Sequence, residues 1–253
     1  MTAEPPAAAP ARRTTLIARV ESIFDHAADT RSLFLSLTGG KHQRFVPGQF
    51  ISITIPLNDE TRSRPYSIAS DPKESGPFEI CFNRVEGGRG VAWLFERQIG
   101  DLIDFSGPFG AFTIDRAPAA DLCFIAEGTA IAPIRPMLKR ALASSPSPKV
   151  ELIYAAPDRE HILYAAEFDA LARTVPSLSY ETVIAPAEKI YDRLFELAQA
   201  RWVTADTDRT RASTPRVVTN RSLRSQSNVA RISVPAQRAR PGLLWMQNSG
   251  QTL

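Results

Sequence analysis

Apolar and polar residues alternate with a period of two from Thr14 to Phe112. A strand turns successive side chains to opposite faces, so this alternation marks half-buried strands. The alternating runs lie at residues 16–21, 33–37, 51–55 and 78–83, and turn residues separate them. Several short strands at this spacing predict a small antiparallel β-barrel or sandwich, interrupted by one helix over residues 91–98.

After Asp115 short apolar runs alternate with segments of helical period. The runs lie at residues 122–126, 150–154 and 180–184, and helices are expected at residues 131–142, 167–173 and 190–197. Strands that alternate with helices pair in parallel and form a doubly wound layer. The sequence therefore predicts a β domain followed by an α/β domain. Pro136 falls in the first of these helices, and we expect it within the first turn, where N–H groups lack partners.

Charge is divided unevenly along the chain. The sequence has 30 basic and 27 acidic residues, with a formal net charge of +3 and a pI of about 9.0. Every acidic residue lies at or before Asp208, so residues 1–208 carry 22 positive and 27 negative charges, a net −5. Residues 209–253 carry eight arginines and no acid, a net +8. The basic pI therefore describes the ending and not the partner of the folded part.

The last part of the chain shows no sustained strand or helix period. We expect a flexible leader at residues 1–12, a β-barrel domain at 13–114, an α/β domain at 115–211, and a basic tail at 212–253 that is disordered or aberrant and adds no strand. The abrupt start of an acid-free, arginine-rich segment favours a shifted reading frame or an aberrant end. A natural disordered basic tail is the alternative.

Cysteine and histidine show no pattern typical of a metal site or a disulfide framework. The two cysteines, Cys81 and Cys123, are far apart, and the three histidines have no paired spacing. No uncharged apolar run approaches the roughly 18 residues that a bilayer span needs. The first ten residues have the features of neither a secretory signal nor a transit peptide. We therefore expect a cytoplasmic protein without a metal ion.

The string Arg64-Pro65-Tyr66-Ser67 follows one predicted strand and continues into another. In an extended strand Arg64 and Tyr66 share one face and Ser67 takes the other. A planar redox ring needs an aromatic platform, a cation for its phosphate, and a small hydroxyl near its reactive nitrogen, and this string offers all three. By spacing alone, an ordinary barrel strand remains the alternative.

Two turns that contain glycine lead into predicted helices. The first comprises Gly88, Arg89, Gly90, Val91 and Ala92, and the second comprises Gly128, Thr129, Ala130 and Pro133. The first turn of a helix presents unpaired N–H groups and the positive end of the helix dipole, which attract phosphate. The second turn also follows a predicted parallel strand, at the sheet edge where ligands bind. A plain loop and helix cap is the alternative for each.

Together these strings resemble the ferredoxin–NADP reductase-like family of flavin-dependent electron-transfer proteins, over about residues 14–205. The resemblance implies that the predicted β-barrel domain is an FAD-binding domain in which Arg64 and Pro65 help to bind FAD, with Arg64 at the pyrophosphate. It implies catalytic positions for Tyr66, against the isoalloxazine ring, and Ser67, near N5. The turn at 88–92 then binds the pyrophosphate, which favours FAD over FMN, and the turn at 128–133 receives NAD(P)H.

Several positions depart from the family pattern. Val91 replaces a serine or threonine, and Glu127 and Ala130 replace two glycines of the nucleotide turn. Pro157 stands where an arginine often holds the ribose or a 2′-phosphate, with Arg159 as the nearest substitute, so NADH is the default donor. The family's C-terminal strand and Cys-Gly-Pro-like turn have no counterpart in residues 212–253. The predicted α/β domain is therefore incomplete and short of its final strands.

The resemblance implies an oxidoreductase that takes hydride from NAD(P)H to FAD and passes electrons to a redox partner protein or a small acceptor. The alternative is a flavin-binding protein with impaired or no turnover, because those C-terminal elements are missing. Nucleic-acid binding by the arginine-rich tail is a third possibility. Against it, the tail has one aromatic residue, Trp245, and the folded part is acidic. We expect neither a membrane nor a nucleic acid as partner.

Overall fold

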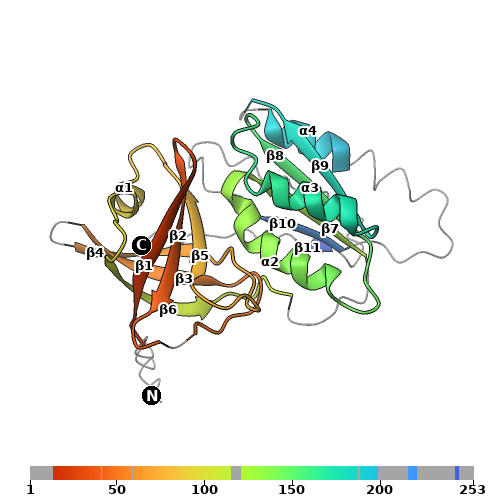
Figure 1. Cartoon of the computed structure of the whole chain (residues 1–253). Helices are drawn as coiled ribbons and strands as arrows, with labels where there is room; N and C mark the ends of the chain where they lie inside the picture. The colour runs from red at the N-terminus through yellow and green to blue at the C-terminus, as the bar shows by residue number, and fades with distance from the viewer. Residues whose placement is uncertain are drawn as a thin grey trace, which may run out of the picture.

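The chain forms two domains that lie side by side (Figure 1). The structure is a computed structural model that describes residues 14–40, 42–57, 60–114, 121–186, 189–198, 216–220 and 243–244. One domain is an antiparallel barrel and the other a parallel sheet covered by helices. The predicted fold class is confirmed.

Six antiparallel strands form the barrel. They are β1 (Leu16–Ala27), β2 (Thr30–Leu37), β3 (Phe50–Leu57), β4 (Glu60–Ser67), β5 (Phe78–Asn83) and β6 (Leu102–Phe109), in the order β4-β3-β6-β1-β2-β5. A bridge between Ile68 and Ile80 joins the residues after β4 to β5. This bridge connects the two edges of the sheet, so the strand that carries the Arg64 string lies beside β5.

The core of the barrel consists of the residues that the alternation predicts. Ile51, Ile53 and Ile55 on β3 and Leu33 and Leu35 on β2 are all 0% exposed. Each such side chain contributes about 1.5–3 kcal/mol when it is fully buried. Helix α1 (Arg89–Phe95) packs on this core with a buried leucine and begins two residues before the predicted helix.

In the described part of the chain, five parallel strands, three α-helices and one 3₁₀ turn form the second domain. The strands are β7 (Leu122–Glu127), β8 (Val150–Ala156), β9 (Leu178–Ile184), β10 (Arg216–Asn220) and β11 (Leu243–Leu244), in the order β11-β10-β7-β8-β9. The helices are η1 (Gly128–Ala130), which is a 3₁₀ turn, α2 (Ile131–Leu142), α3 (Ala165–Thr174) and α4 (Ile190–Ala198). Residues of α2 and α3 share one apolar cluster with β7 and β8, and residues of α4 form another with β8 and β9. Helices therefore cover both faces of the sheet, as a doubly wound layer requires.

The prediction that residues 212–253 add no strand is wrong. β10 pairs in parallel with β7 along its whole length, and β11 pairs with β10. Three consecutive β-branched residues, Val217, Val218 and Thr219, favour a strand here. Its two apolar residues are adjacent and fewer than those of the predicted strands before it, so its local composition is the signal that the periodicity missed. The predicted domain boundaries stay predictions. β10 and β11, which lie after the predicted boundary at residue 211, belong to the same sheet as β7, β8 and β9.

The expected position of Pro136 within the first turn of its helix is also wrong. Pro136 lies in the second turn of α2, where it cannot donate to the carbonyl of Ala132. The helix nevertheless continues to Leu142. Its inner face, with Ile134 and Leu138 both 0% exposed, packs on the sheet, and such tertiary packing outweighs one lost backbone hydrogen bond.

Candidate cofactor site

The Arg64 string lies on β4, at the edge of the sheet and paired with β3. An edge strand is where a proline such as Pro65 is tolerated. Arg64 is exposed, Ser67 is half-buried, and Tyr66 is only 8% exposed. The string therefore presents a cation and a hydroxyl to solvent, while its aromatic ring is mostly inside the barrel.

Tyr66 lies at the border of the barrel core. Its ring packs edge-on against Phe82, with 5.8 Å between ring centroids. Burial raises the pKa of Tyr66 well above its ordinary value, against a smaller opposite effect of Arg64. The ring is thus held in place and its hydroxyl stays protonated, but only a small part of it can face a ligand.

The first turn of α1 lies beside the arginine of β4. A Cβ atom at Gly90 would lie 3.2 Å from Cδ1 of Ile55 and 3.7 Å from Cγ of Arg64. Two strings that are well separated in the sequence therefore meet in space. A guanidinium beside the N–H groups of a helix start is an arrangement that fits a pyrophosphate.

Not all five residues of this turn can offer a backbone donor. The N–H of Gly88 donates to the carbonyl of Val85 at 2.9 Å, and the N–H of Ala92 donates to the carbonyl of Gly88 at 3.0 Å. The donors that a helix start leaves without an intrahelical acceptor are those of Arg89, Gly90 and Val91. Within residues 88–92, these three N–H groups are therefore the ones open to a pyrophosphate, and binding by the turn stays a prediction. Gly88 is needed for the turn itself, since a Cβ there would lie 2.9 Å from the Val85 carbonyl oxygen.

The predicted nucleotide turn follows β7 as a 3₁₀ turn, with Gly128 at a φ of +52°. The hydroxyl of Tyr154 on β8 donates to the carbonyl of Gly128 at 3.0 Å and accepts from the N–H of Leu163 at 3.1 Å. Burial raises the pKa of Tyr154, so this hydroxyl stays a donor. The sequence pattern identified Tyr154 only as a strand residue, since no local signal shows where a buried hydroxyl points.

The side chains of the nucleotide turn face the protein more than solvent. The Thr129 hydroxyl donates to the side-chain oxygen of Asn83 on β5 at 2.9 Å, which links the turn to the barrel. Ala130 is 3% exposed and Pro133 is buried in α2. These three residues therefore shape the turn, and the surface that a ligand can reach is its backbone around Gly128.

Glu127 ends β7 directly before this turn and is 8% exposed. The pattern of the family that the sequence resembles has glycine here, so the carboxylate is an addition to the predicted site. A negative charge beside a turn that receives phosphate opposes binding.

The loop after β8 links the two domains through a histidine. Nδ1 of His161 lies 2.7 Å from Oδ1 of Asp158, and its Nε2 lies 2.9 Å from Oδ1 of Asp29 in the β1–β2 hairpin. Burial acts to lower the pKa of His161, but the two carboxylates outweigh it and raise the pKa. Arg159 is exposed in the same loop.

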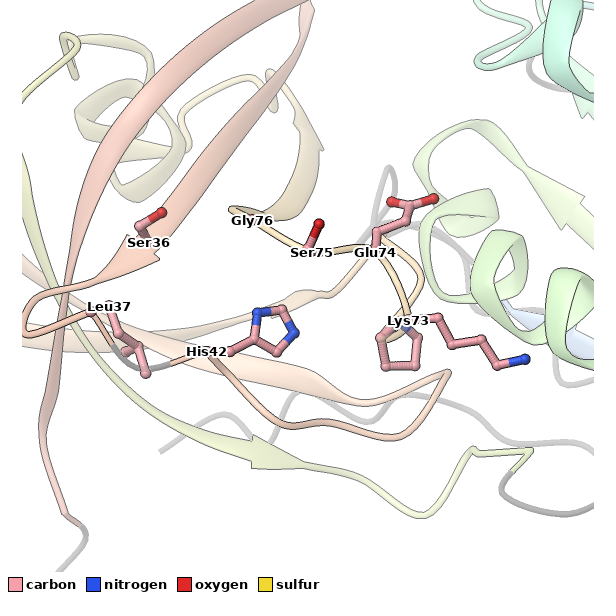
Figure 2. A pocket seen from close by; sticks show the side chains of 9 residues that line it. Ser36, Leu37, His42, Lys73, Glu74, Ser75 and Gly76 are labelled. Atoms are coloured by element: carbon pink, nitrogen blue, oxygen red, sulfur yellow. The ribbon is translucent and has the colours of Figure 1, made fainter.

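A groove of about 470 Å³ lies elsewhere on the barrel (Figure 2). Ser36, Leu37, Gly40 and His42 line it on one side and residues 72–76 on the other, with the His42 ring facing it. None of the predicted cofactor-binding residues lines this groove. The groove is therefore separate from the predicted site where β4 and α1 meet.

The described residues contain no group of three or more His, Cys, Asp or Glu side chains placed to hold a metal ion. Within the same part of the chain, no helix is long and apolar enough to cross a membrane.

Comparison with known proteins agrees with this geometry. Residues 18–114 match the oxidoreductase FAD-binding domain family, and residues 124–197 match the oxidoreductase NAD-binding domain family. Ferredoxin–NADP reductase B of Sorangium cellulosum (strain So ce56) is 33% identical over 167 residues, which cover 66% of this chain and 68% of that protein. The ferredoxin reductase component of 3-ketosteroid-9-alpha-monooxygenase from Rhodococcus rhodochrous is 32% identical over 64% of this chain and 47% of its own length.

A solved structure shows the same arrangement. The Amycolatopsis cytochrome P450 reductase GcoB superposes with a TM-score of 0.62 at 28% identity, over 68% of this chain and 52% of that one. The chain thus spans about half the length of several relatives that it matches.

An antiparallel barrel followed by a parallel sheet with helices on both of its faces is the two-domain arrangement of flavin and nicotinamide reductases. The chain belongs to the ferredoxin–NADP reductase-like family of FAD- and NAD(P)-binding oxidoreductases. The predicted family and the predicted cofactors, FAD with NAD(P)H as substrate, are confirmed.

Proposed function

We propose that this chain is an electron-transfer oxidoreductase that takes hydride from NAD(P)H to FAD and passes electrons to a separate acceptor. The observation that carries the proposal is the contact distance between the Gly90 position and Arg64, which brings the two flavin-binding strings together. FAD, when bound, supplies the redox chemistry, since it accepts a hydride and releases electrons singly or in pairs. The protein contributes binding and orientation.

The residues of β4 and α1 have separate tasks in this proposal. Arg64 and the N–H groups of Arg89, Gly90 and Val91 bind the pyrophosphate, which only a dinucleotide offers, so FAD is favoured over FMN. Val91 supplies no hydroxyl, so the backbone carries this contact.

The two proposed catalytic positions, Tyr66 and Ser67, orient the flavin ring. The half-buried Ser67 places a hydroxyl at the end of β4, where it can donate to a ring nitrogen or oxygen. Pro65 restricts the backbone between Arg64 and Tyr66. Tyr66 is held in place by Phe82 and is mostly buried. It therefore contacts the flavin ring with its edge rather than with a fully exposed face.

The turn at Gly128, Thr129 and Ala130 receives the nicotinamide nucleotide through its backbone. NADH is the proposed donor, because no arginine stands at Pro157 to hold a 2′-phosphate. The Asp158 carboxylate lies at the same edge and is hydrogen-bonded to His161. This hydrogen bond lowers the pKa of Asp158, against a smaller opposite effect of burial. A charged carboxylate there disfavours a second phosphate.

The proposed acceptor is a redox partner protein or a small electron acceptor. Relatives are named as reductases or reductase components of ferredoxin, monooxygenase, dioxygenase and P450 systems, which supports a protein acceptor. We propose a cytoplasmic location, with neither a membrane nor a nucleic acid as partner. The acidic net charge of residues 1–208 supports the last point, since phosphate backbones attract basic surfaces.

The second candidate is a flavin-binding protein with impaired or no turnover. The buried Glu127 beside the nucleotide turn favours it, because a carboxylate there opposes the pyrophosphate of NADH.

Steady-state electron transfer from NADH to ferricyanide separates the two candidates. The full chain, reconstituted with FAD, should reduce ferricyanide at a rate that depends on both FAD and NADH. Protein that retains FAD through gel filtration but reduces no ferricyanide establishes the second candidate. Protein that retains no FAD contradicts both.

A further inference from the structure

Arg135 reaches from the nucleotide domain into the barrel. It lies on α2, seven residues and so about two helical turns after the nucleotide-binding backbone at Gly128. Its Nη1 donates to the backbone carbonyl of Ala69 at 3.0 Å and to Oε2 of Glu79 at 3.0 Å. Its Nε donates to Oε2 of Glu167 on α3 at 2.8 Å. One guanidinium therefore joins both domains.

Glu79 is the partner on the barrel side and is 3% exposed. Its backbone N–H donates to the Ser70 hydroxyl at 3.0 Å, and its carbonyl accepts from the N–H of Ala69 at 2.8 Å. Ala69 and Ser70 directly continue the strand that carries Ser67. Glu79 is thus hydrogen-bonded to Ala69 and Ser70, which follow shortly after the proposed flavin contact, Ser67.

Tyr164 completes the cluster from the start of α3. Its hydroxyl donates to Oε1 of Glu79 at 2.7 Å, and the guanidinium carbon of Arg135 lies 4.5 Å from the centre of its ring. Its φ is +57°, and within the described ranges no other residue except glycine has a positive φ. A left-handed conformation is unfavourable for a bulky residue and persists only where the surroundings impose it. Here it turns the ring toward the barrel.

The charges of the cluster match. Burial acts to lower the pKa of Arg135, but Glu167 and Glu79 outweigh it and raise the pKa, so the guanidinium stays charged. Besides the Tyr164 hydroxyl, Oε1 of Glu79 accepts from the Ser32 hydroxyl at 2.5 Å. The Ser32 oxygen also lies 2.8 Å from Nε2 of His26. Both carboxylate oxygens of Glu79 therefore have donors, as a buried charge requires.

We propose that Arg135, Glu79 and Tyr164 are positioning residues that fix the nucleotide-binding turn against the flavin strand. Two short covalent paths make this possible: Ser67 to Ala69 on the barrel side, and Gly128 to Arg135 on the other. The cluster then sets the distance between the nicotinamide and the flavin over which hydride moves. The turns that bind each cofactor determine its affinity. The consequence for hydride transfer rests on the proposed function.

Distances between the domains test this positioning without any turnover. Spin labels on Asp104→Cys and Arg173→Cys report the separation of the barrel from the nucleotide domain, since both positions are exposed and the native Cys81 and Cys123 are buried. In this labelled background the test variants are Arg135→Gln and the milder Tyr164→Phe. Tyr180→Phe is the matched control, because its buried hydroxyl has no hydrogen-bond partner among the described residues.

Pulsed electron spin resonance should give a narrow distance distribution for the parent and for Tyr180→Phe. It should broaden for Tyr164→Phe and more so for Arg135→Gln. An unchanged distribution in both test variants overturns the proposal, and this outcome does not depend on NADH oxidation.

Anaerobic stopped-flow reduction by NADH adds the kinetic readout. The limiting rate of flavin reduction should fall at least about tenfold in Arg135→Gln, with less than about a threefold change in the Kd for NADH, because hydride transfer depends steeply on donor position. A broadened distribution with an unchanged limiting rate overturns the kinetic part of the proposal. If the parent protein itself is not reduced by NADH, the proposed function fails while the distance distributions still decide on the positioning.

Discussion

Gly90 and Arg64 are close neighbours, with 3.7 Å between the Cγ of Arg64 and the position of a Cβ on Gly90. The distance brings the start of a helix and a strand cation to one point on the barrel surface. Neither group alone defines a phosphate site, whereas together they offer a full charge and backbone donors.

Replacement of Arg64 by alanine should weaken FAD binding by about tenfold to a hundredfold, since a hydrogen bond to a charged group contributes about 1.5–3 kcal/mol. Titration of the apoprotein with FAD, followed by flavin fluorescence, measures the effect. Arg19→Ala on β1 is the control, because Arg19 is equally exposed but far along the sheet order from β4. Equal dissociation constants for the two variants would argue against a flavin site at β4.

Replacement of Glu127 by glutamine should tighten NADH binding by about threefold to tenfold, because it removes a partly desolvated negative charge beside the turn. Isothermal titration of the FAD-loaded protein with NADH under anaerobic conditions provides the Kd. Glu21→Gln, on an exposed position of β1, controls for the change in net charge. If Glu127→Gln leaves the Kd unchanged or raises it, the carboxylate does not oppose the nucleotide.

Gly48 should tolerate no side chain. Its φ is +99°, and a Cβ there would lie 2.0 Å from the backbone oxygen of Phe112, at the exit from the barrel toward the second domain. Gly39 has nearly the same φ, +96°, with nothing within 4 Å of its Cβ position. Urea unfolding should show a loss of about 1 kcal/mol for Gly39→Ala and at least about 3 kcal/mol for Gly48→Ala, since only the second adds a backbone clash to the conformational strain. Equal losses would mean that the close approach to Phe112 is not rigid.

The His161 contact with Asp29 and Asp158 should strengthen as the pH falls. The folded-state pKa of His161 is raised, so its contribution is fully present below the unfolded pKa of about 6.5 and disappears as the pH rises through the folded value. His161→Gln should therefore lower the melting temperature more at about pH 5.5 than at about pH 8.5.

Subtraction of the parent protein at each pH removes the opposite contribution of His26, whose pKa burial lowers. An equal loss at both pH values would show that His161 is not charged in the contact. Asp29→Asn should abolish much of the pH dependence, because it removes the barrel-side carboxylate.

Periodicity predicts most of the fold because a strand or helix that is buried on one face has apolar residues at a regular spacing in the sequence. The isoleucines of β3 and the inner face of α2 lie where the alternation and the helical spacing place them. β10 shows no such spacing, since it has only two apolar residues, Val217 and Val218, which are adjacent and do not alternate with polar ones, and it depends on the open edge of β7 for its partner.

The site could be predicted only as far as local strings define it. Arg64 and the turn before α1 are visible in the sequence, but the engagement of the Gly88 and Ala92 N–H groups depends on how the loop closes. The link between Arg135 and Glu79 joins residues 56 positions apart, and no local pattern shows such a pair. Long-range polar contacts between domains therefore require the structure.

The most direct test of the central claim is the visible absorbance spectrum of the purified full chain with FAD, before and after anaerobic addition of NADH. The account predicts a bound-flavin spectrum that persists after gel filtration and bleaches when NADH is added. A chain that retains no flavin, and therefore shows no visible absorbance to bleach, would contradict it.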